Sequence, residues 1–257
     1  MLNFRTTNII FGIALVGLAA YHVYAGIPVY LYFLLALAYS LLLFRGSYLV
    51  SSDFYFRVIC SAKTNQKQIA ISFDDGPVPV STPQILDLLR EYDVPAAFFC
   101  IGKRIEGNEE LLKQVYEAGH LIGNHSYSHD TWFDLFSAGK MAADLQQMDR
   151  AMEKAIGKKP KLFRPPYGVT NPNLKKAVLK GNYIPVGWNI RSLDTVITDE
   201  QRLLLKVTKA LKPGAVVLFH DTGKAIPAVL PAFIRQARMK GYEIVRLDKL
   251  LKLEAYV

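Results

Sequence analysis

The first 45 residues contain two long apolar runs separated by a short connection. Residues 8–24 (NIIFGIALVGLAAYHVY) and residues 27–44 (IPVYLYFLLALAYSLLLF) contain no Asp, Glu, Lys or Arg. Each run has about the 17 to 25 residues that a membrane-spanning helix needs. The short connection favours a hairpin, and Arg45 ends the second run. We therefore predict a transmembrane helical hairpin over residues 1–45, with helices near 8–24 and 27–44.

A cleaved signal peptide is the alternative interpretation of the first run. Only Arg5 precedes that run, and no clear small-residue cleavage site follows it, so the hairpin is favoured. If both helices span, the N-terminus and the rest of the chain lie on one side of the membrane. Arg5 and Arg45 flank a loop without Lys or Arg, so the positive-inside rule indicates the cytoplasmic side.

Residues 46–67 mix polar and aromatic positions, which predicts a linker. After Gln68, short apolar runs alternate with segments of helical spacing. The runs are QIAISF, AAFFCIG, HLIG, KLF, YIPVGWNI, GAVVLFH and YEIVRL. Repeated strand–helix units predict an α/β domain with a parallel sheet. About seven such units over residues 68–257 favour a (β/α) barrel over an open sheet.

Composition and charge narrow the classes of partner. The chain has 257 residues and is 51% hydrophobic, enough for one catalytic-sized domain besides the hairpin. The net charge is +9, but its Lys and Arg residues are scattered, so we expect a membrane-adjacent surface and no nucleic-acid partner. Two cysteines, Cys60 and Cys100, cannot form a disulfide framework and leave the compartment open.

Polar side chains follow the predicted strands. The carboxyl ends of parallel strands meet at one edge of the sheet, so we expect these side chains to lie close together. His125 and His129 form an HxxxH pair, which by itself is more often structural than metal-binding. Three of the five histidines nevertheless follow predicted strands, which favours a site. The residues expected at this edge are Asp74, Asp75, His125, His129, Arg164, Asp194 and His220.

Two adjacent carboxylates raise each other's pKa unless a cation binds one of them. Asp75 with His125 and His129 would provide three ligands to zinc or a similar ion and leave open positions, as in hydrolytic metal sites. Asp74 then remains free as a base. His220 is a candidate general acid that Asp194 orients, and Arg164 is a candidate partner for Asp74.

These motifs resemble those of the polysaccharide deacetylases, the chitooligosaccharide deacetylase-like carbohydrate esterases of family 4. FDDGP, HSYSH, RPPYG, Asp194 and VVLFH carry the resemblance, which covers about residues 68–250. It implies a deformed (β/α) barrel, a metal held by Asp75, His125 and His129, and Asp74 as the catalytic base. It further implies that Arg164 positions Asp74, that the Tyr167 backbone N–H binds the oxyanion, and that His220 is an acid tuned by Asp194. The predicted substrate contacts are Pro166, Tyr167, Arg191 and Leu218.

One motif departs from the family pattern. Many members carry DxxDW, whereas this chain has Arg191 and Thr195 at the first and last of these positions and keeps Asp194. We therefore still expect activity, and Arg191 suggests an anionic substrate. The aromatic residues in SHDTWFDLF (Trp132, Phe133 and Phe136) favour a core cluster, with a lip beside membrane or substrate as the alternative.

The resulting prediction is a metal-dependent hydrolase that removes N-acetyl groups from a polysaccharide or oligosaccharide by cleaving a C–N amide bond. Zinc is the expected cation, with cobalt, nickel and manganese as alternatives. We expect anchoring in the cytoplasmic (inner) membrane with the catalytic domain facing the cell envelope, where such glycans lie. This expectation outweighs the positive-inside indication, because long domains can cross a membrane despite flanking charge. The alternatives are a deformylase or deacetylase of a lipid-linked sugar, or an inactive membrane-tethered glycan-binding protein. A transporter is disfavoured, because His22 is the one ionisable residue apart from tyrosines in the apolar runs.

Overall fold

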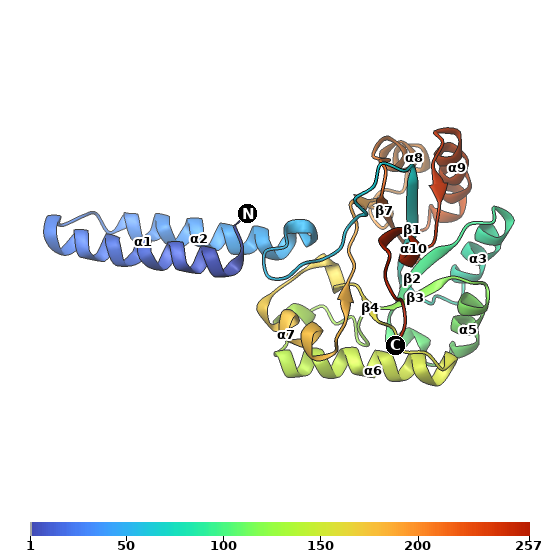
Figure 1. Ribbon diagram of the computed structural model, residues 1–257, viewed down its shortest axis with the longest axis horizontal. Helices are drawn as coiled ribbons and strands as arrows, with labels where there is room; N and C mark the ends of the chain where they lie inside the picture. The colour runs from blue at the N-terminus through green and yellow to red at the C-terminus, as the bar shows by residue number, and fades with distance from the viewer. Residues whose placement is uncertain (1) are drawn as a thin grey trace.

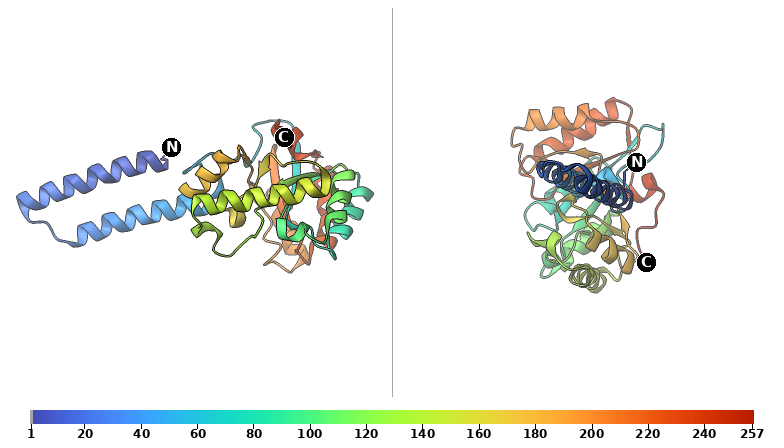
Figure 2. Two further views of the ribbon diagram at one scale, coloured as in Figure 1. Left: turned by 90° about the horizontal axis from the view of Figure 1, so that it is seen from below. Right: turned by 90° about the vertical axis from the view of Figure 1, so that its left-hand side faces the viewer.

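The computed structural model describes residues 2–257. Two apolar helices, α1 (Phe4–Ala25) and α2 (Tyr30–Tyr48), run antiparallel and project from an α/β domain (Figures 1 and 2). The hydroxyl of Tyr39 donates a hydrogen bond to Asn8 Oδ1 at 2.9 Å, which joins the two helices. Both are long and apolar enough to cross a membrane, although a signal sequence near an N-terminus would share these properties.

Both helices extend beyond the apolar runs. Asn3 caps α1, since its side chain accepts a hydrogen bond from the Thr6 N–H at 3.0 Å and the Thr6 hydroxyl accepts one from the Asn3 N–H. Gly26, with φ of 66°, ends α1 in the left-handed conformation that glycine adopts easily. The helix therefore begins four residues before the uncharged run, because its cap lies in the polar segment.

The domain contains a curled parallel sheet. Seven strands follow the order β5-β4-β3-β2-β1-β7-β6, and an eighth pairs with β1. All pairings between these strands are parallel, which confirms the predicted (β/α) barrel of about seven strands, here curled into a half-barrel. The strands are β1 (Gln68–Gly76), β2 (Ala96–Cys100), β3 (Leu121–Asn124), β4 (Leu162–Phe163), β5 (Ile184–Pro185), β6 (Ile190–Arg191), β7 (Ala215–His220) and β8 (Glu243–Ile244).

Amphipathic helices cover the outside of the sheet (Figure 1). Their apolar faces pack on side chains such as Phe73, Phe98 and Phe219, which are fully or almost fully buried. This packing holds the strands together and fixes where their carboxyl ends lie. The helices are α3 (Thr82–Glu91), α4 (Gly102–Ile105), α5 (Glu109–Glu117), α6 (Ala138–Ile156), α7 (Pro172–Lys180), α8 (Glu200–Lys209), α9 (Ile226–Met239) and α10 (Leu247–Leu251), with short 3₁₀ turns η1 (Val50–Ser52), η2 (Phe133–Leu135) and η3 (Pro166–Gly168).

The run YIPVGWNI forms two short strands, β5 and β6, rather than one. Between them the backbone of Gly187 approaches the Cys60 side chain so closely that a Cβ at Gly187 would lie 2.7 Å from the Cys60 sulfur. The chain therefore leaves one end of the sheet at β5 and returns at the other end as β6. Residues that precede β1 pack against the chain between these two strands, as Ile59 does at Val186 and Cys60 at Gly187.

Residues 46–67 lie against the domain. Ile59 forms a parallel bridge with Val186, and Ser61 forms an antiparallel bridge with Ala215 at the start of β7. Four apolar side chains in this segment are buried. The segment predicted as a linker thus contributes to the core through Val50, Phe54, Tyr55 and Val58.

Candidate active site

The carboxyl ends of the strands bring the predicted residues to one edge. Asp74 and Asp75 lie at the end of β1, and Asp74 pairs with His220 at the end of β7. The chain leaves β3 through His125 and His129, leaves β4 through Arg164, and leaves β6 toward Asp194. Parallel pairing accounts for this grouping of residues that are distant in the sequence.

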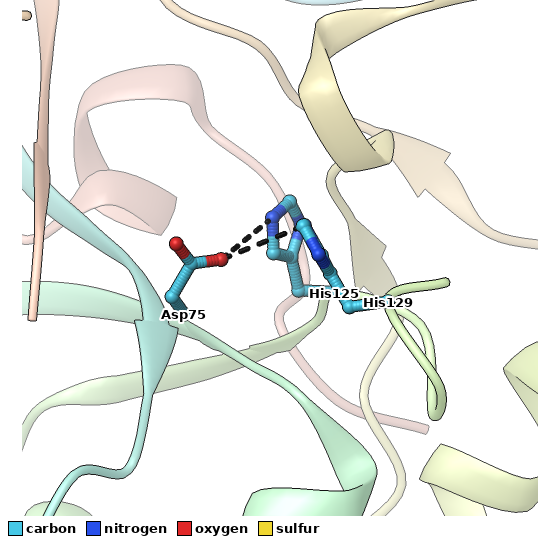
Figure 3. A group of neighbouring side chains, drawn as sticks. All are labelled: Asp75, His125 and His129. Atoms are coloured by element: carbon cyan, nitrogen blue, oxygen red, sulfur yellow. Dashed lines mark ion pairs between the residues drawn. The ribbon is translucent and has the colours of Figure 1, made fainter. Parts of the chain in front are cut away.

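Asp75, His125 and His129 form a cluster suited to a metal ion (Figure 3). The Nε2 atoms of His125 and His129 lie 3.7 Å and 3.5 Å from Asp75 Oδ1, and one ligand atom from each residue falls within 4.8 Å of the others. Tetrahedral zinc with bonds of about 2.1 Å places its ligand atoms roughly 3.4 Å apart. The donor set and its spacing therefore fit zinc or a similar divalent ion.

The electrostatics of the two histidines also suit a cation. His125 Nδ1 lies 2.9 Å from the Arg164 carbonyl oxygen, so a proton on Nδ1 can donate to that carbonyl and leave Nε2 with a free lone pair. Burial, followed by the neighbouring His125, lowers the pKa of His129 to about 4. His129 is therefore neutral near pH 7, which is the state that binds a metal.

Asp74 has different neighbours from Asp75. Its side chain is buried, and Oδ1 accepts a hydrogen bond from Arg164 Nη1 at 2.6 Å. Arg164 is fully buried, and its remaining donors bind the Ser72 hydroxyl at 2.9 Å and the carbonyls of Val186 and Gly187 at 3.2 Å and 3.0 Å. The guanidinium is thus held on several sides and fixes the Asp74 carboxylate in one orientation.

His220 and Asp194 form a second pair at the same edge. His220 Nδ1 lies 2.7 Å from Asp194 Oδ1, and the His220 backbone N–H donates to Asp194 Oδ2 at 2.7 Å. Burial alone lowers the pKa of His220, but the hydrogen bond that its imidazole donates to Asp194 and the negative charges of Asp74, Asp194 and Asp75 outweigh it, so the pKa is raised. The imidazole is therefore oriented, and its protonated form is stabilised.

The predicted substrate contacts occupy different positions. Pro166 is buried in η3, whereas Tyr167 is 44% exposed and its hydroxyl donates to the His129 carbonyl at 3.2 Å. Arg191 is exposed at the end of β6, with its guanidinium 5.9 Å from the centre of the Trp188 ring. Leu218 is buried within β7, two residues before His220 and on the same side of that strand.

Several site residues have unusual backbone geometry. Asp75, His129 and Tyr167 have φ angles of 73°, 44° and 57°, in the left-handed region that non-glycine residues rarely adopt. Residues in this region persist where the surrounding structure holds them, and they cluster at functional sites. The angle at Asp75 falls at a register irregularity between Asp74 and Gly76, which interrupts the regular pairing where the two carboxylates lie.

The sequence patterns missed four residues behind the site. Ser72 donates its hydroxyl to the Val217 carbonyl and accepts from Arg164. Asp221 is buried and accepts a hydrogen bond from the Thr82 hydroxyl, and burial raises its pKa to about 7. Arg104 donates to the Asp75 carbonyl. Two of these residues lie next to a quoted motif: Asp221 follows VVLFH and Ser72 precedes FDDGP. Thr82 and Arg104 lie in segments without a motif.

The aromatic residues after the two histidines divide between core and surface. Phe133 is fully buried and packs near Phe136, which agrees with the core prediction. Trp132 is 66% exposed and Leu135 is 74% exposed. The exposure of Trp132 fits the alternative prediction, a lip beside membrane or substrate.

Known proteins resemble this chain over the domain that carries the site. The family model described as polysaccharide deacetylase matches residues 61–185. A Bacillus cereus peptidoglycan-N-acetylglucosamine deacetylase is 38% identical over 193 residues, which cover 73% of this chain and 90% of that protein. The peptidoglycan-N-acetylglucosamine deacetylase PgdA of Listeria monocytogenes is 34% identical over 74% of this chain and 40% of its own length. The chain thus spans less than half of this second relative.

Solved structures show the same fold. The crystal structure of a peptidoglycan N-acetylglucosamine deacetylase in complex with an N-hydroxybenzamide aligns with a TM-score of 0.72 and 29% identity over 77% of this chain and 94% of that one. A Bacillus anthracis protein described as a family 4 carbohydrate esterase pseudoenzyme aligns with a TM-score of 0.69 and 27% identity over 75% of this chain and 68% of that one. Because the fold includes a pseudoenzyme, activity has to be argued from side chains.

Proposed function

The chain belongs to the polysaccharide deacetylase family, and from this premise we propose that it is a metal-dependent hydrolase that removes N-acetyl groups from a polysaccharide or oligosaccharide. One observation carries the proposal. The buried Asp74, fixed by Arg164 at 2.6 Å, lies beside the Asp75–His125–His129 cluster and opposite the His220–Asp194 pair. A base, a cation site and an acid therefore meet at one edge of the sheet.

A divalent cation bound by Asp75, His125 and His129, with zinc as the proposed ion, would acidify water and polarise the acyl carbonyl. Asp74 accepts the proton of the attacking water through Oδ2. Its other oxygen, Oδ1, is bonded to Arg164, whereas Oδ2 faces the cation cluster and lies 3.8 Å from His125 Nε2. The Tyr167 backbone N–H is the proposed donor to the developing oxyanion.

His220 supplies the proton that the leaving amine needs. An amide nitrogen departs poorly unless it is protonated, and the raised pKa of His220 favours the protonated imidazole that supplies this proton. Asp194 orients the imidazole through the 2.7 Å contact at Nδ1, which directs Nε2 away from Asp194. The products are acetate and a glycan amine.

Peptidoglycan or a chitooligosaccharide is the proposed class of substrate, because relatives are named for these glycans. Pro166, Tyr167, Arg191 and Leu218 are the proposed contacts. The exposed Arg191 favours an acetylated saccharide that carries carboxylates. At low salt, acetate release from carboxylate-bearing peptidoglycan fragments should be faster than from neutral oligomers, and Arg191→Gln should lose this difference. Equal rates on the two substrates would contradict the preference.

We also propose that α1 and α2 anchor the chain in the cytoplasmic membrane, with the domain on the side that faces the cell envelope. Their length, apolar composition and exposed surfaces support the anchor, and the cell-wall substrates named for the relatives support the envelope side. The inactive glycan-binding protein is the second candidate, favoured only by the existence of a pseudoenzyme with this fold.

The deciding experiment measures acetate release by the full-length protein in detergent, from chitooligosaccharides and peptidoglycan fragments. Activity should disappear with a chelator and return with zinc. Asp74→Asn should retain about one bound zinc per chain but lose at least about 10³-fold in kcat. His125→Ala should instead lose zinc. A folded, zinc-loaded protein that releases no acetate from either glycan would contradict the proposal and favour the binding protein.

A further inference from the structure

The hairpin joins the domain at the edge that carries the site. The Thr170 N–H donates to the Ser47 carbonyl at 3.0 Å, and the Thr170 hydroxyl donates to the Gly46 carbonyl at 3.3 Å. Thr170 follows Tyr167 by three residues in the loop after β4. The end of α2 is therefore bonded directly to the loop that contributes Tyr167 to the site.

No spacer separates the apolar helices from the domain. The exposed Phe44 ends the apolar run, and Gly46, two residues later, is buried against the Phe54 ring. The start of α1 is fastened at the same place, since the Phe4 N–H donates to the Phe54 carbonyl at 2.9 Å. With both helix ends attached, the domain has little freedom to move away from a membrane that holds the hairpin.

An exposed apolar loop lies at this end of the domain. Residues 130–136, here called the 130–136 loop, precede α6, and the loop is tied to the start of α7 by the Asn171 side-chain amide, which donates to the Asp134 carbonyl at 2.9 Å. Figure 1 shows α7 and the start of α6 at the end from which the hairpin projects, with α3 and α5 at the far end. Trp132 and Leu135, 66% and 74% exposed, are the large apolar side chains of this loop that face solvent.

Cationic side chains border the same junction. Arg5 and Lys175 line a cavity of about 650 Å³ together with one acidic residue, Asp53, and apolar side chains that include Phe4 and Phe54. Arg45 ends the apolar run of α2. Lys175 lies on α7, the helix to whose start the loop is tied. Exposed tryptophan and leucine at the same end of a domain as Lys and Arg match the boundary between acyl chains and anionic headgroups, where an apolar side chain and a cation both find partners.

We propose that the 130–136 loop contacts the bilayer surface through Trp132 and Leu135, so that hairpin and loop together hold the mouth of the site against the membrane. The substrate is then an acetylated glycan presented at the membrane surface, such as a lipid-linked saccharide, rather than glycan chains that lie farther from the membrane. This inference rests on the proposed deacetylase function and on the hairpin being embedded. A glycan contact for Trp132 is the competing outcome that the test separates.

The contact can be tested without any activity. Full-length Trp188→Phe, in which Trp132 is the one remaining tryptophan, is reconstituted in anionic vesicles with phospholipid brominated near the headgroup. Side chains at the interface lie within about 5 to 10 Å of such positions, so Trp132 emission should fall at least about two-fold relative to unbrominated vesicles. The control combines Trp132→Phe, Trp188→Phe and Glu110→Trp, which moves the indole to an exposed position on α5 at the far end. Quenching of Trp132 no greater than in this control would overturn the proposal.

A second measurement addresses the substrate. The double variant Trp132→Ser/Leu135→Ser should release acetate several-fold more slowly than the unmodified protein from an N-acetylated lipid-linked saccharide in the same vesicles. Its rate on the water-soluble saccharide of the same sugar should be unchanged. Equal losses on both substrates would make the loop a sugar contact and overturn the membrane assignment. If the unmodified protein hydrolyses neither, the deacetylase function fails, and the quenching result still decides the membrane contact.

Discussion

Two adjacent carboxylates at the end of β1 have separate partners. Asp74 is 3% exposed and bonded to Arg164, whereas Asp75 adopts φ of 73° and lies near the Nε2 atoms of His125 and His129. The positive φ angle interrupts the regular alternation of the strand, so both side chains can serve the same edge. A cation on Asp75 and a guanidinium on Asp74 relieve the repulsion that two unpaired carboxylates would have.

The His220–Asp194 pair leads to a prediction about pH. Asp194 contributes to the raised pKa of His220, and His220 has to be protonated to act as an acid. Activity should therefore fall as the pH rises through this pKa. Asp194→Asn removes a negative charge, lowers that pKa, and should move the alkaline limb of kcat/KM to lower pH by about one unit, with a loss of about ten-fold or more at pH 8.

The measurement is the pH profile of kcat/KM for the unmodified protein and Asp194→Asn. Ser192→Ala is the matched control, because the Ser192 hydroxyl donates to Asp194 Oδ1 at 2.6 Å and its loss leaves the carboxylate charge in place. The control should shift the alkaline limb less than Asp194→Asn does. An unchanged alkaline limb in Asp194→Asn would show that His220 is not the acid.

At the scale of elements, the junction between α2 and the domain depends on one close approach. A Cβ at Gly46 would collide with the Phe54 ring, and the same helix turn accepts hydrogen bonds from Thr170 through the Gly46 and Ser47 carbonyls. Glycine lets the backbone of α2 approach this ring. The junction is therefore specified by the small residue and by the aromatic side chain that covers it.

Gly46→Val should loosen this junction and leave the sheet intact. We expect faster proteolytic cleavage within residues 49–67, by about ten-fold, because the Phe54 ring has to move out of its place. Gly12→Val is the matched control, since a Cβ at Gly12 meets nothing within 4 Å. Limited proteolysis in detergent, with fragments identified by mass, gives the rates. Equal rates in the two variants would mean that the Gly46 contact does not hold the segment.

At the scale of the whole molecule, the segment between hairpin and β1 belongs to the domain's packing. Ile59 pairs with Val186, which directly follows β5, and Ser61 pairs with Ala215 at the start of β7. Val50, Phe54, Tyr55 and Val58 are at most 7% exposed. The hairpin is thus connected through a packed segment, which sets the direction in which the site faces relative to the helices.

Two soluble fragments should therefore differ in stability. Residues 46–257 keep the packed segment, whereas residues 64–257 lose its four buried side chains. Burying each such side chain contributes about 1.5 to 3 kcal/mol, so the loss of four should lower the free energy of unfolding of the shorter fragment by roughly 6 to 12 kcal/mol. Urea unfolding followed by circular dichroism measures the difference. Equal midpoints would show that the segment adds no stability.

Features that depend on local patterns could be predicted from the order of the amino acids. Uncharged runs predicted the helices α1 and α2, alternating runs predicted the parallel strands of a (β/α) barrel, and the motif spacings placed Asp74, Asp75, His125, His129 and His220 at one edge. These predictions succeeded because apolar periodicity and strand-end positions are properties of neighbouring residues.

Features that join distant segments could be found in the folded molecule alone. Four features follow from which surfaces meet across the fold. They are the packing of residues 46–67, the division of YIPVGWNI into two strands, the hydrogen bonds of Ser72 and Thr82, and the exposure of Trp132 beside the buried Phe133. The bond from Thr170 to Gly46 joins residues 124 positions apart and places the hairpin at the edge of the site. No local pattern specifies such a contact, because its energy depends on a partner that only folding brings near.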